Sequence, residues 1–177
     1  PVAGNTTHLT VVDGDGLVVS MTNTITSFWG SGQTLGGFFL NDQLSRFEAI
    51  PSAANTPEPG RRSVSWSMPT IVLDADGAPV LGIGSPGGAQ IPIVLAHVIV
   101  QHLLHEESLE DAVAAPRFIL TDGVLTAEPA LSGETAAGVE ALGWSVRTVT
   151  LEQAVFGSVQ ALAIDPGSGA VTSAVDT

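Results

Sequence analysis

Three acidic turns that contain glycine constrain the fold of this chain more than any other feature of its sequence. Each stands between two short runs rich in β-branched or apolar residues, a pattern typical of hairpins. The turns are 13–16, 74–77 and 165–169, and the paired runs are 9–12 with 17–24, 71–73 with 79–84, and 159–164 with 170–174. A calcium-binding loop would need twelve residues and a terminal glutamate, which these turns lack. The sequence therefore predicts a largely antiparallel sheet.

Helical segments are expected in the second half of the chain. A long apolar run follows the glycine-rich turn 84–88, Ser108 has the character of a helix cap, and Gly143 that of a helix end. The expected helices are 91–104, 108–115 and 132–142, the further strands are 118–120, 124–126 and 144–149, and the loops are 27–37 and 51–62. Strands with helices on one face give an α+β fold.

Composition narrows the classes of function. The chain of 177 residues is 44% hydrophobic, so residues 1–177 are expected to form a single domain. With 18 acidic residues, five arginines and no lysine, it has no basic stripe for nucleic acid or an anionic membrane. The run 91–104 is too short to span a bilayer. There is no cysteine, which excludes disulfides and thiolate metal sites within the chain.

Histidines on the expected helix 91–104 and just after it could suggest a metal site. His102 and His105 have a spacing that permits a metal pair, but no third ligand is identifiable and the surroundings are apolar. We interpret these two residues and His97 as core or helix-end histidines. The sequence predicts no metal and no cofactor.

Thr6 and Thr7 lie in the polar segment 4–8 that opens the first strand, and a threonine there is either an ordinary strand residue or a latent nucleophile. A threonine hydroxyl needs a base within hydrogen-bond reach, and its own α-amine can serve when the threonine is N-terminal. That amine has a reference pKa of about 7.7–8.0 and can act as a base near neutral pH. The alternative is that Thr6 is an ordinary residue at a strand edge.

The turn 84–88, with the sequence Gly-Ser-Pro-Gly-Gly, lies between an apolar strand and an apolar helix. Such a turn presents backbone N–H groups at the positive end of a helix, where a developing oxyanion can be bound. The alternative is a tight strand-to-helix turn with no chemical role. Ser85 is not a hydrolase nucleophile, because Ile83 stands where that motif requires glycine.

Three separated motifs together resemble the small subunit of the γ-glutamyltransferase family. They are Thr-Thr-His-Leu-Thr-Val-Val-Asp-Gly-Asp-Gly at 6–16, Val-Ser-Met-Thr-Asn-Thr at 19–24 and Gly-Ser-Pro-Gly-Gly at 84–88. The resemblance runs over nearly the whole chain. It implies the four-layer αββα sandwich of N-terminal-nucleophile hydrolases, of which this chain would form the small-subunit part. A large subunit from the same precursor would supply the rest.

The resemblance also assigns roles to residues. It implies autocleavage between Asn5 and Thr6, after which Thr6 attacks a small-molecule amide donor and passes the acyl group to water or an amine. Thr24 would support the nucleophile's amine, and Gly87 and Gly88 would form the oxyanion hole. His8 would be structural. By resemblance the protein would be secreted or periplasmic, while the sequence itself leaves the compartment open, the cytoplasm included.

The expected donor pocket departs from the family pattern. Gln43 and Ser65 match donor-binding residues, but Arg46 stands where the family has an acidic residue that binds the donor's α-ammonium. Trp66 replaces the second family serine, and Thr26 replaces an asparagine. Since arginine repels an ammonium and pairs with a carboxylate, we expect an acyl group without a free α-amine, such as a glutaryl-like chain or a blocked glutamyl unit.

Two other classes of function stay open on the sequence. One is a catalytically silent family member that binds a ligand or a partner, since the donor pocket is changed and the bond before Thr6 is intact in the chain as given. The other is a non-enzymatic β-rich module. If the chain is an enzyme, this uncleaved form is expected to be an inactive precursor or fragment.

Overall fold

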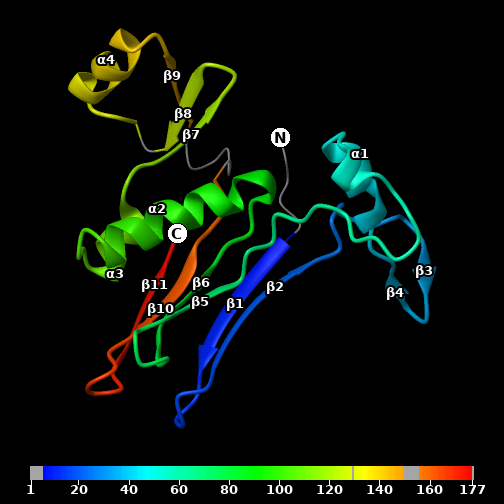
Figure 1. Ribbon diagram of the computed structural model, residues 1–177, viewed down its shortest axis with the longest axis horizontal. Helices are drawn as coiled ribbons and strands as arrows, with labels where there is room; N and C mark the ends of the chain where they lie inside the picture. The colour runs from blue at the N-terminus through cyan, green and yellow to red at the C-terminus, as the bar shows by residue number, and fades with distance from the viewer. Residues whose placement is uncertain (1–5, 129, 150–155, 177) are drawn as a thin grey trace.

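The chain forms three stacked layers, with helices on one face of a central sheet and a hairpin on the other (Figure 1). The structure, a computed structural model, describes residues 6–128, 130–149 and 156–176. The strands are β1 Thr6–Val12, β2 Val18–Thr24, β3 Thr34–Leu35, β4 Phe38–Phe39, β5 Thr70–Leu73, β6 Pro79–Gly84, β7 Arg117–Thr121, β8 Val124–Glu128, β9 Ser145–Thr148, β10 Gln160–Ile164 and β11 Val171–Val175. The α-helices are α1 Arg46–Ala49, α2 Ile91–Leu103, α3 Leu109–Ala114 and α4 Gly133–Ala141, with 3-10 turns η1 Gln43–Ser45, η2 Ala53–Asn55 and η3 Gly88–Gln90.

The central sheet contains four antiparallel strands in the order β11-β10-β6-β5. In β6, Leu81 and Ile83 are fully buried and belong to one core with Val94 and Leu95 of α2. Burying each large aliphatic side chain contributes roughly 1.5–3 kcal/mol, so the contact between α2 and this sheet forms the main hydrophobic core. The hairpins β5–β6 and β10–β11, expected from the second and third acidic turns, are confirmed.

The first expected hairpin, β1–β2, is also confirmed, but it packs on the central sheet as a separate layer. The close approach depends on two glycines of β6. A methyl group at Gly82 would lie 2.6 Å from Thr10 Cγ2. One at Gly84 would lie 2.1 Å from His8 Cε1. Strand β6 therefore turns aliphatic side chains toward α2 and bare backbone toward the hairpin.

The three expected helices are confirmed as α2, α3 and α4, and the serines that precede α3 and α4 cap them, of which Ser108 was the expected cap. Ser108 Oγ accepts a hydrogen bond from the Asp111 N–H at 3.1 Å, and Ser132 Oγ accepts one from Thr135 at 3.1 Å. Such caps satisfy N–H groups that have no partner within the helix. None of the helices in the described part of the chain has the length and apolar character needed to cross a membrane.

Two parts of the fold differ from the sequence expectation in detail. The segment 27–37, expected to be a loop, contributes β3, which pairs with β4. Strand β9 pairs with β8 in parallel, because α4 lies between them and returns the chain to the starting end of β8. The α+β class and the antiparallel character hold, but the strands are divided among four small sheets.

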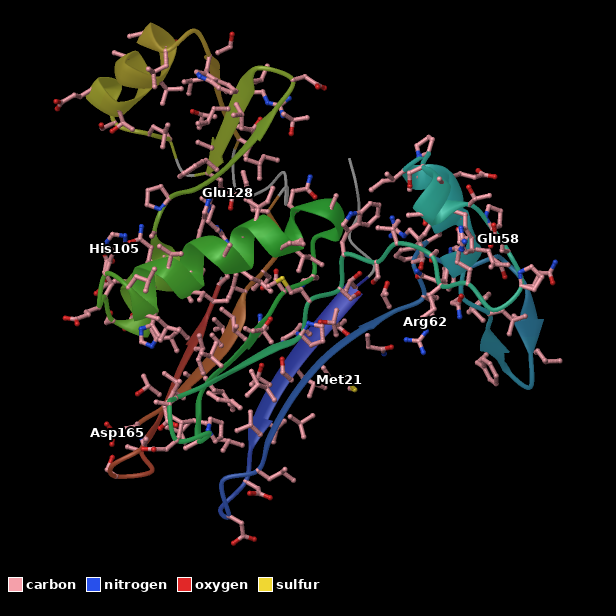
Figure 2. All side chains as sticks on the ribbon, in the orientation of Figure 1. Met21, Glu58, Arg62, His105, Glu128 and Asp165 are labelled. Atoms are coloured by element: carbon pink, nitrogen blue, oxygen red, sulfur yellow. The ribbon has the colours of Figure 1, made fainter. Side chains whose placement is uncertain are left out.

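A buried ion cluster joins the β7–β9 sheet to the end of β11. Arg117 is 4% exposed and donates a hydrogen bond to Glu128 at 2.9 Å and another to Asp176. Figure 2 shows Glu128 beside α2, where the β7–β9 sheet meets the central layers. Burial raises the pKa of Glu128, and the nearby positive charge of Arg117 opposes this effect. Loss of Arg117 would leave two carboxylates facing each other without a cation.

Substitution Arg117→Met should lower the free energy of unfolding by about 3–5 kcal/mol, because removing one partner of a buried ion pair leaves uncompensated charge. Arg62→Met is the matched control, since Arg62 is exposed and its replacement should change stability by less than about 0.5 kcal/mol. Urea denaturation of the chain measures both. Equal effects of the two substitutions would contradict a stabilising role for the cluster.

Candidate active site

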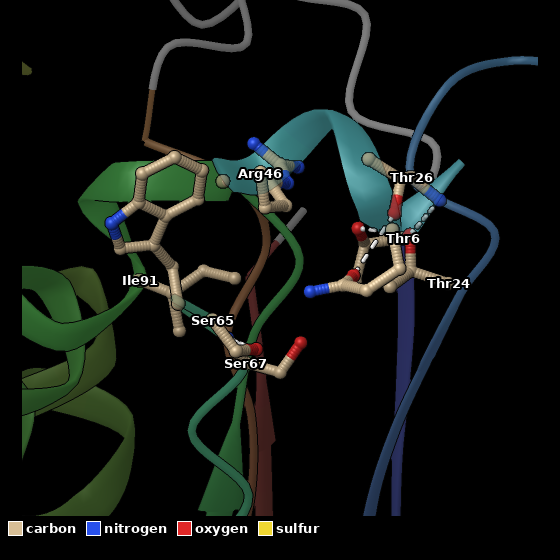
Figure 3. Close-up of a pocket in the computed structure, with 10 residues that line it drawn as sticks. Thr6, Thr24, Thr26, Arg46, Ser65, Ser67 and Ile91 are labelled. Atoms are coloured by element: carbon tan, nitrogen blue, oxygen red, sulfur yellow. Dashed lines mark hydrogen bonds between the residues drawn. The ribbon is translucent and has the colours of Figure 1, made fainter. Parts of the chain in front are cut away.

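A small pocket lies where four segments of the chain converge. These segments are the paired ends of β1 and β2, the η1–α1 turn, the extended segment 61–69 and the start of α2 (Figure 3). Its lining residues are Thr6, Thr24, Thr26, Gln43, Arg46, Ser65, Trp66, Ser67, Gly88 and Ile91. The fold therefore brings together eight of the residues singled out from the sequence. Asn5, the other residue of the expected cleavage site, lies outside the described residues.

Thr6 and Thr24 form the centre of the pocket's polar wall. They are cross-strand partners at the ends of β1 and β2, and the Thr6 hydroxyl donates to Thr24 Oγ1 at 3.1 Å. The backbone N–H of Thr26 donates to the same oxygen at 3.0 Å. The Thr24 hydroxyl is thus fixed by the backbone and in turn orients the Thr6 hydroxyl.

Thr26 occupies an unfavourable backbone conformation at the edge of the pocket. Its φ of 77° lies in the left-handed region, which is costly for a β-branched residue. Its hydroxyl donates to Gln43 Oε1 at 3.2 Å. The turn after β2 is therefore held in a strained shape that directs Thr26 toward both Thr24 and Gln43.

Gln43 was expected to bind substrate, but its side-chain amide is engaged by the protein. The Nε2 group donates to Ser63 Oγ at 2.8 Å and to the Val64 carbonyl at 3.3 Å, while Oε1 accepts from Thr26. Gln43 thus connects the end of β2 to the extended segment 61–69. It lines the pocket and also stabilises the pocket wall.

Arg46 and Trp66 are in direct contact. The guanidinium carbon of Arg46 lies 4.4 Å from the centroid of the Trp66 ring, a cation–π contact that contributes roughly 0.5–1 kcal/mol when partly exposed. None of the ion pairs found within 6–128, 130–149 and 156–176 involves Arg46. Its positive charge is held at the pocket by the indole ring and has no carboxylate partner in this part of the chain.

The glycine-rich turn leads into α2 as expected. Gly87 and Gly88 have φ values of 139° and 66°, which a side chain would strain, and η3 and α2 follow directly. Gly88 lines the pocket, whereas Gly87 packs against Gly157, whose Cα would lie 3.4 Å from a Cβ at position 87. The positive end of α2 thus lies at the wall opposite the threonines.

None of the histidines lines this pocket. His97 stacks on Phe118 with ring centroids 4.4 Å apart, and His102 Nδ1 lies 2.8 Å from the Glu107 carbonyl at the end of α2. Burial lowers the pKa of both His8 and His97. Over the described ranges, no three histidine, aspartate or glutamate side chains are grouped so that they could hold a metal ion.

Sequence reasoning missed three residues of the site: Ser67, Ile91 and Ser63. Ser67 stands two positions after Ser65, its backbone N–H donates to Ser65 Oγ at 3.2 Å, and both residues line the pocket, so the neighbouring serine was a usable signal. Ile91 is the first residue of α2. Ser63 contacts Gln43 from 20 positions away, which no local pattern indicates.

Comparisons with known proteins give one consistent family. The family described as Gamma-glutamyltranspeptidase matches residues 1–177. The capsule biosynthesis protein CapD proenzyme of Bacillus anthracis is 39% identical over 172 residues, which is 97% of this chain and 32% of that protein. The glutathione hydrolase proenzyme of Bacillus subtilis strain 168 is 35% identical over 180 residues, or 99% and 30%. The chain spans about a third of the length of these relatives.

Solved structures agree with this assignment. A γ-glutamyltranspeptidase from Pseudomonas nitroreducens complexed with L-DON has a TM-score of 0.81 and 31% identity, with 96% of this chain and 94% of that chain covered. The Bacillus anthracis transpeptidase CapD has a TM-score of 0.75 and 36% identity, with 96% and 93% covered. The fold expected from the sequence, part of an N-terminal-nucleophile hydrolase, is confirmed.

Substitution Thr26→Asn should raise the free energy of unfolding by about 1 kcal/mol, because asparagine adopts a positive φ more readily and can still donate to Gln43. Thr26→Val keeps the branched Cβ and loses the hydroxyl, so it should lower stability by about 1 kcal/mol. Urea denaturation distinguishes the two. A destabilising Thr26→Asn would show that the conformation is not strained.

Proposed function

Because this chain belongs to the γ-glutamyltranspeptidase family of hydrolases and transferases, we propose that it carries the nucleophile and the acyl pocket of an N-terminal-threonine amidase. Residues 1–177 would be the small-subunit domain of a precursor, with 1–5 preceding the cleavage site. The observation that supports this most is the convergence of Thr6, Thr24 and Gly88 on one pocket. A nucleophile, a hydroxyl that orients it and a helix start are the groups that acyl transfer requires.

The first proposed step is activation of the precursor. The Thr6 hydroxyl attacks the carbonyl carbon of Asn5, the peptide bond between them breaks, and an ester to Thr6 Oγ1 replaces it. Water then hydrolyses the ester and leaves Thr6 with a free α-amine. The hydrogen bond from the Thr6 hydroxyl to Thr24 Oγ1 favours this step because it limits rotation of the attacking hydroxyl.

In turnover, the α-amine of Thr6 would accept the hydroxyl proton while Oγ1 attacks the amide carbonyl of the donor. Backbone N–H groups of Gly87 and Gly88 would bind the resulting oxyanion, and the amine would return the proton to the leaving group. Water or an acceptor amine then takes the acyl group from Thr6. Oxyanion donors of this kind contribute roughly 10²–10³-fold in rate, and a general base roughly 10²–10⁴-fold.

Donor recognition would depend on Arg46. Among the described residues that line the pocket it is the one charged side chain, and it is held on Trp66 at 4.4 Å. A cation there attracts a carboxylate and repels an ammonium. We therefore assign the enzyme an acyl donor with a carboxylate and no free α-amine, such as a glutaryl-like chain or a blocked glutamyl unit, with Ser65 as a further contact and Gln43 supporting the pocket wall through Ser63 and Val64.

The expected partner is a large subunit from the same precursor, as the proenzyme names of the relatives suggest. The outer face of the β1–β2 hairpin is the surface best suited to it. Leu9, Val11, Val19 and Met21 are 42–50% exposed there, with Leu9 opposite Met21 and Val11 opposite Val19. Met21 points away from the stacked layers (Figure 2). Contiguous apolar surface of this kind is typical of an interface.

Expression of this chain with its large subunit as one precursor should yield a fragment that begins at Thr6. Thr6→Ala should abolish cleavage, because no hydroxyl remains to attack the Asn5 carbonyl. Thr7→Ala is the matched control and should cleave, since that side chain lies on the opposite face of β1. Intact mass spectrometry measures all three. A wild-type precursor that stays uncut on long incubation would instead favour a catalytically silent protein that binds a ligand.

On the mature enzyme, glutaryl anilides should be better substrates than γ-glutamyl anilides. Arg46→Gln should lower kcat/KM for the glutaryl donor by about 10–100-fold, the equivalent of one lost hydrogen bond to a charged group. Arg46→Glu should in addition favour the γ-glutamyl donor. Arg62→Glu makes the same charge change outside the pocket and should leave the ratio of the two donors unaltered. A wild-type preference for γ-glutamyl would refute the assigned donor class.

A further inference from the structure

The two halves of the proposed machinery lie on strands that belong to different sheets. Thr6 begins β1, while Gly87 and Gly88 follow β6, which ends at Gly84. Strand β1 pairs with β2, and β6 pairs with β5 and β10. Side chains packed between the layers must therefore set the separation of the two strands, because no backbone ladder does.

His8 is the side chain that fills the space between β1 and the end of β6. A methyl group at Gly84 would lie 2.1 Å from His8 Cε1, 2.3 Å from Nδ1 and 2.5 Å from Nε2. Real Cβ atoms do not approach other atoms this closely, so the imidazole rests directly on the Gly84 backbone. His8 is also two residues from Thr6 and on the same face of β1.

Hydrogen bonds fix the ring in this place. Its Nδ1 lies 2.8 Å from Thr22 Oγ1, and its Nε2 lies 3.0 Å from Thr10 Oγ1. Ser20 Oγ lies 3.4 Å from Nε2 and donates to the Ile83 carbonyl of β6 at 3.1 Å. The ring is thus held on both nitrogens by the hairpin, and Ser20 links the same cluster to the backbone next to Gly84.

His8 does not contact the pocket that contains Thr6. It lines a separate space with Leu9, Thr10 and residues of β10 and β11. Its ring nitrogens bond to hydroxyls of Thr22 and Thr10, so it does not form a nucleophile–histidine pair with Thr6. Any effect of His8 on catalysis must therefore act through the positions of other groups.

We propose that His8 is a positioning residue, whose ring on Gly84 sets the distance between the Thr6 nucleophile and the Gly87–Gly88 turn. This role rests on the proposed function of those groups. Substitution of the ring or of Gly84 would shift β1 relative to β6 and carry Thr6 with it. A displacement of about 1 Å between reacting groups can cost about 100-fold in rate, while substrate contacts elsewhere in the pocket remain.

The test uses the mature enzyme assembled with its large subunit, and kcat is counted per active site by titration with an acylating inhibitor. Gly84→Ala and His8→Ala should each lower kcat by about 10–100-fold with little change in KM. Gly14→Ala is the control, because a methyl there meets nothing within 4 Å in the turn of the same hairpin. It should leave kcat unaltered.

The double variant His8→Ala/Gly84→Ala separates positioning from folding. Removing the ring relieves its clash with the methyl group introduced at position 84, so Gly84→Ala should lower Tm less in the His8→Ala background than in the wild-type protein. The low kcat should persist, because without the ring no side chain held by Thr10 and Thr22 sets the separation of β1 and β6. A double variant with wild-type kcat per site, or single variants with normal kcat per site, would overturn the proposal.

The same experiment distinguishes failure of the positioning role from failure of the proposed function. A wild-type protein with no amidase activity would refute the proposed function. A smaller Tm loss for Gly84→Ala in the His8→Ala background than in the wild-type protein would still support the His8–Gly84 contact, and a Tm unaffected by Gly84→Ala would overturn it independently of activity.

Discussion

The structure depends on a close stacking of the β1–β2 hairpin on β6, which is possible because one face of β6 has no side chains at its end. Gly82 and Gly84 leave room for Thr10 and His8, while Leu81 and Ile83 on the other face complete the core with α2. The hairpin side chains that face the central sheet are largely polar. Burying hydroxyls and an imidazole is costly unless they are hydrogen-bonded, and the network of Thr22, His8 and their neighbours satisfies this condition.

This stacking also determines where the pocket forms. The hairpin and the central sheet converge where β1 begins and β6 ends, so the first residue of one strand lies near the turn that follows the other. Backbone N–H and C=O groups at the ends of strands and helices have no hydrogen-bond partner within their own element. The site consequently has backbone donors at the start of α2 and side-chain hydroxyls on the hairpin, and Gln43 links these walls to the segment 61–69.

Turn and helix-capping residues predicted the helices and strands well, because each of these signals acts within a few residues of the chain. The acidic turns indicated three hairpins, and Ser108 and Ser132 indicated helix starts. The arrangement of those hairpins was not predictable, since the sequence does not state which hairpins share a sheet. The hairpin also places Leu9 outward and His8 inward, against the usual expectation that apolar residues face the core. The family resemblance predicted most of the pocket residues. It did not predict the hydrogen bond from the Gln43 amide to Ser63, because that bond joins two segments 20 positions apart.

The two largest departures from the family pattern are physically one change. Arg46 and Trp66 come from separate segments and would count as independent substitutions in the sequence, yet they are in contact. A guanidinium in a partly enclosed site needs a favourable surface, and an indole face provides one. Because the chain has a net charge of −13, an anionic donor would be repelled over most of its surface. On the proposed assignment of the donor, the stacked cation that lines the same pocket as Thr6 would offset this repulsion locally.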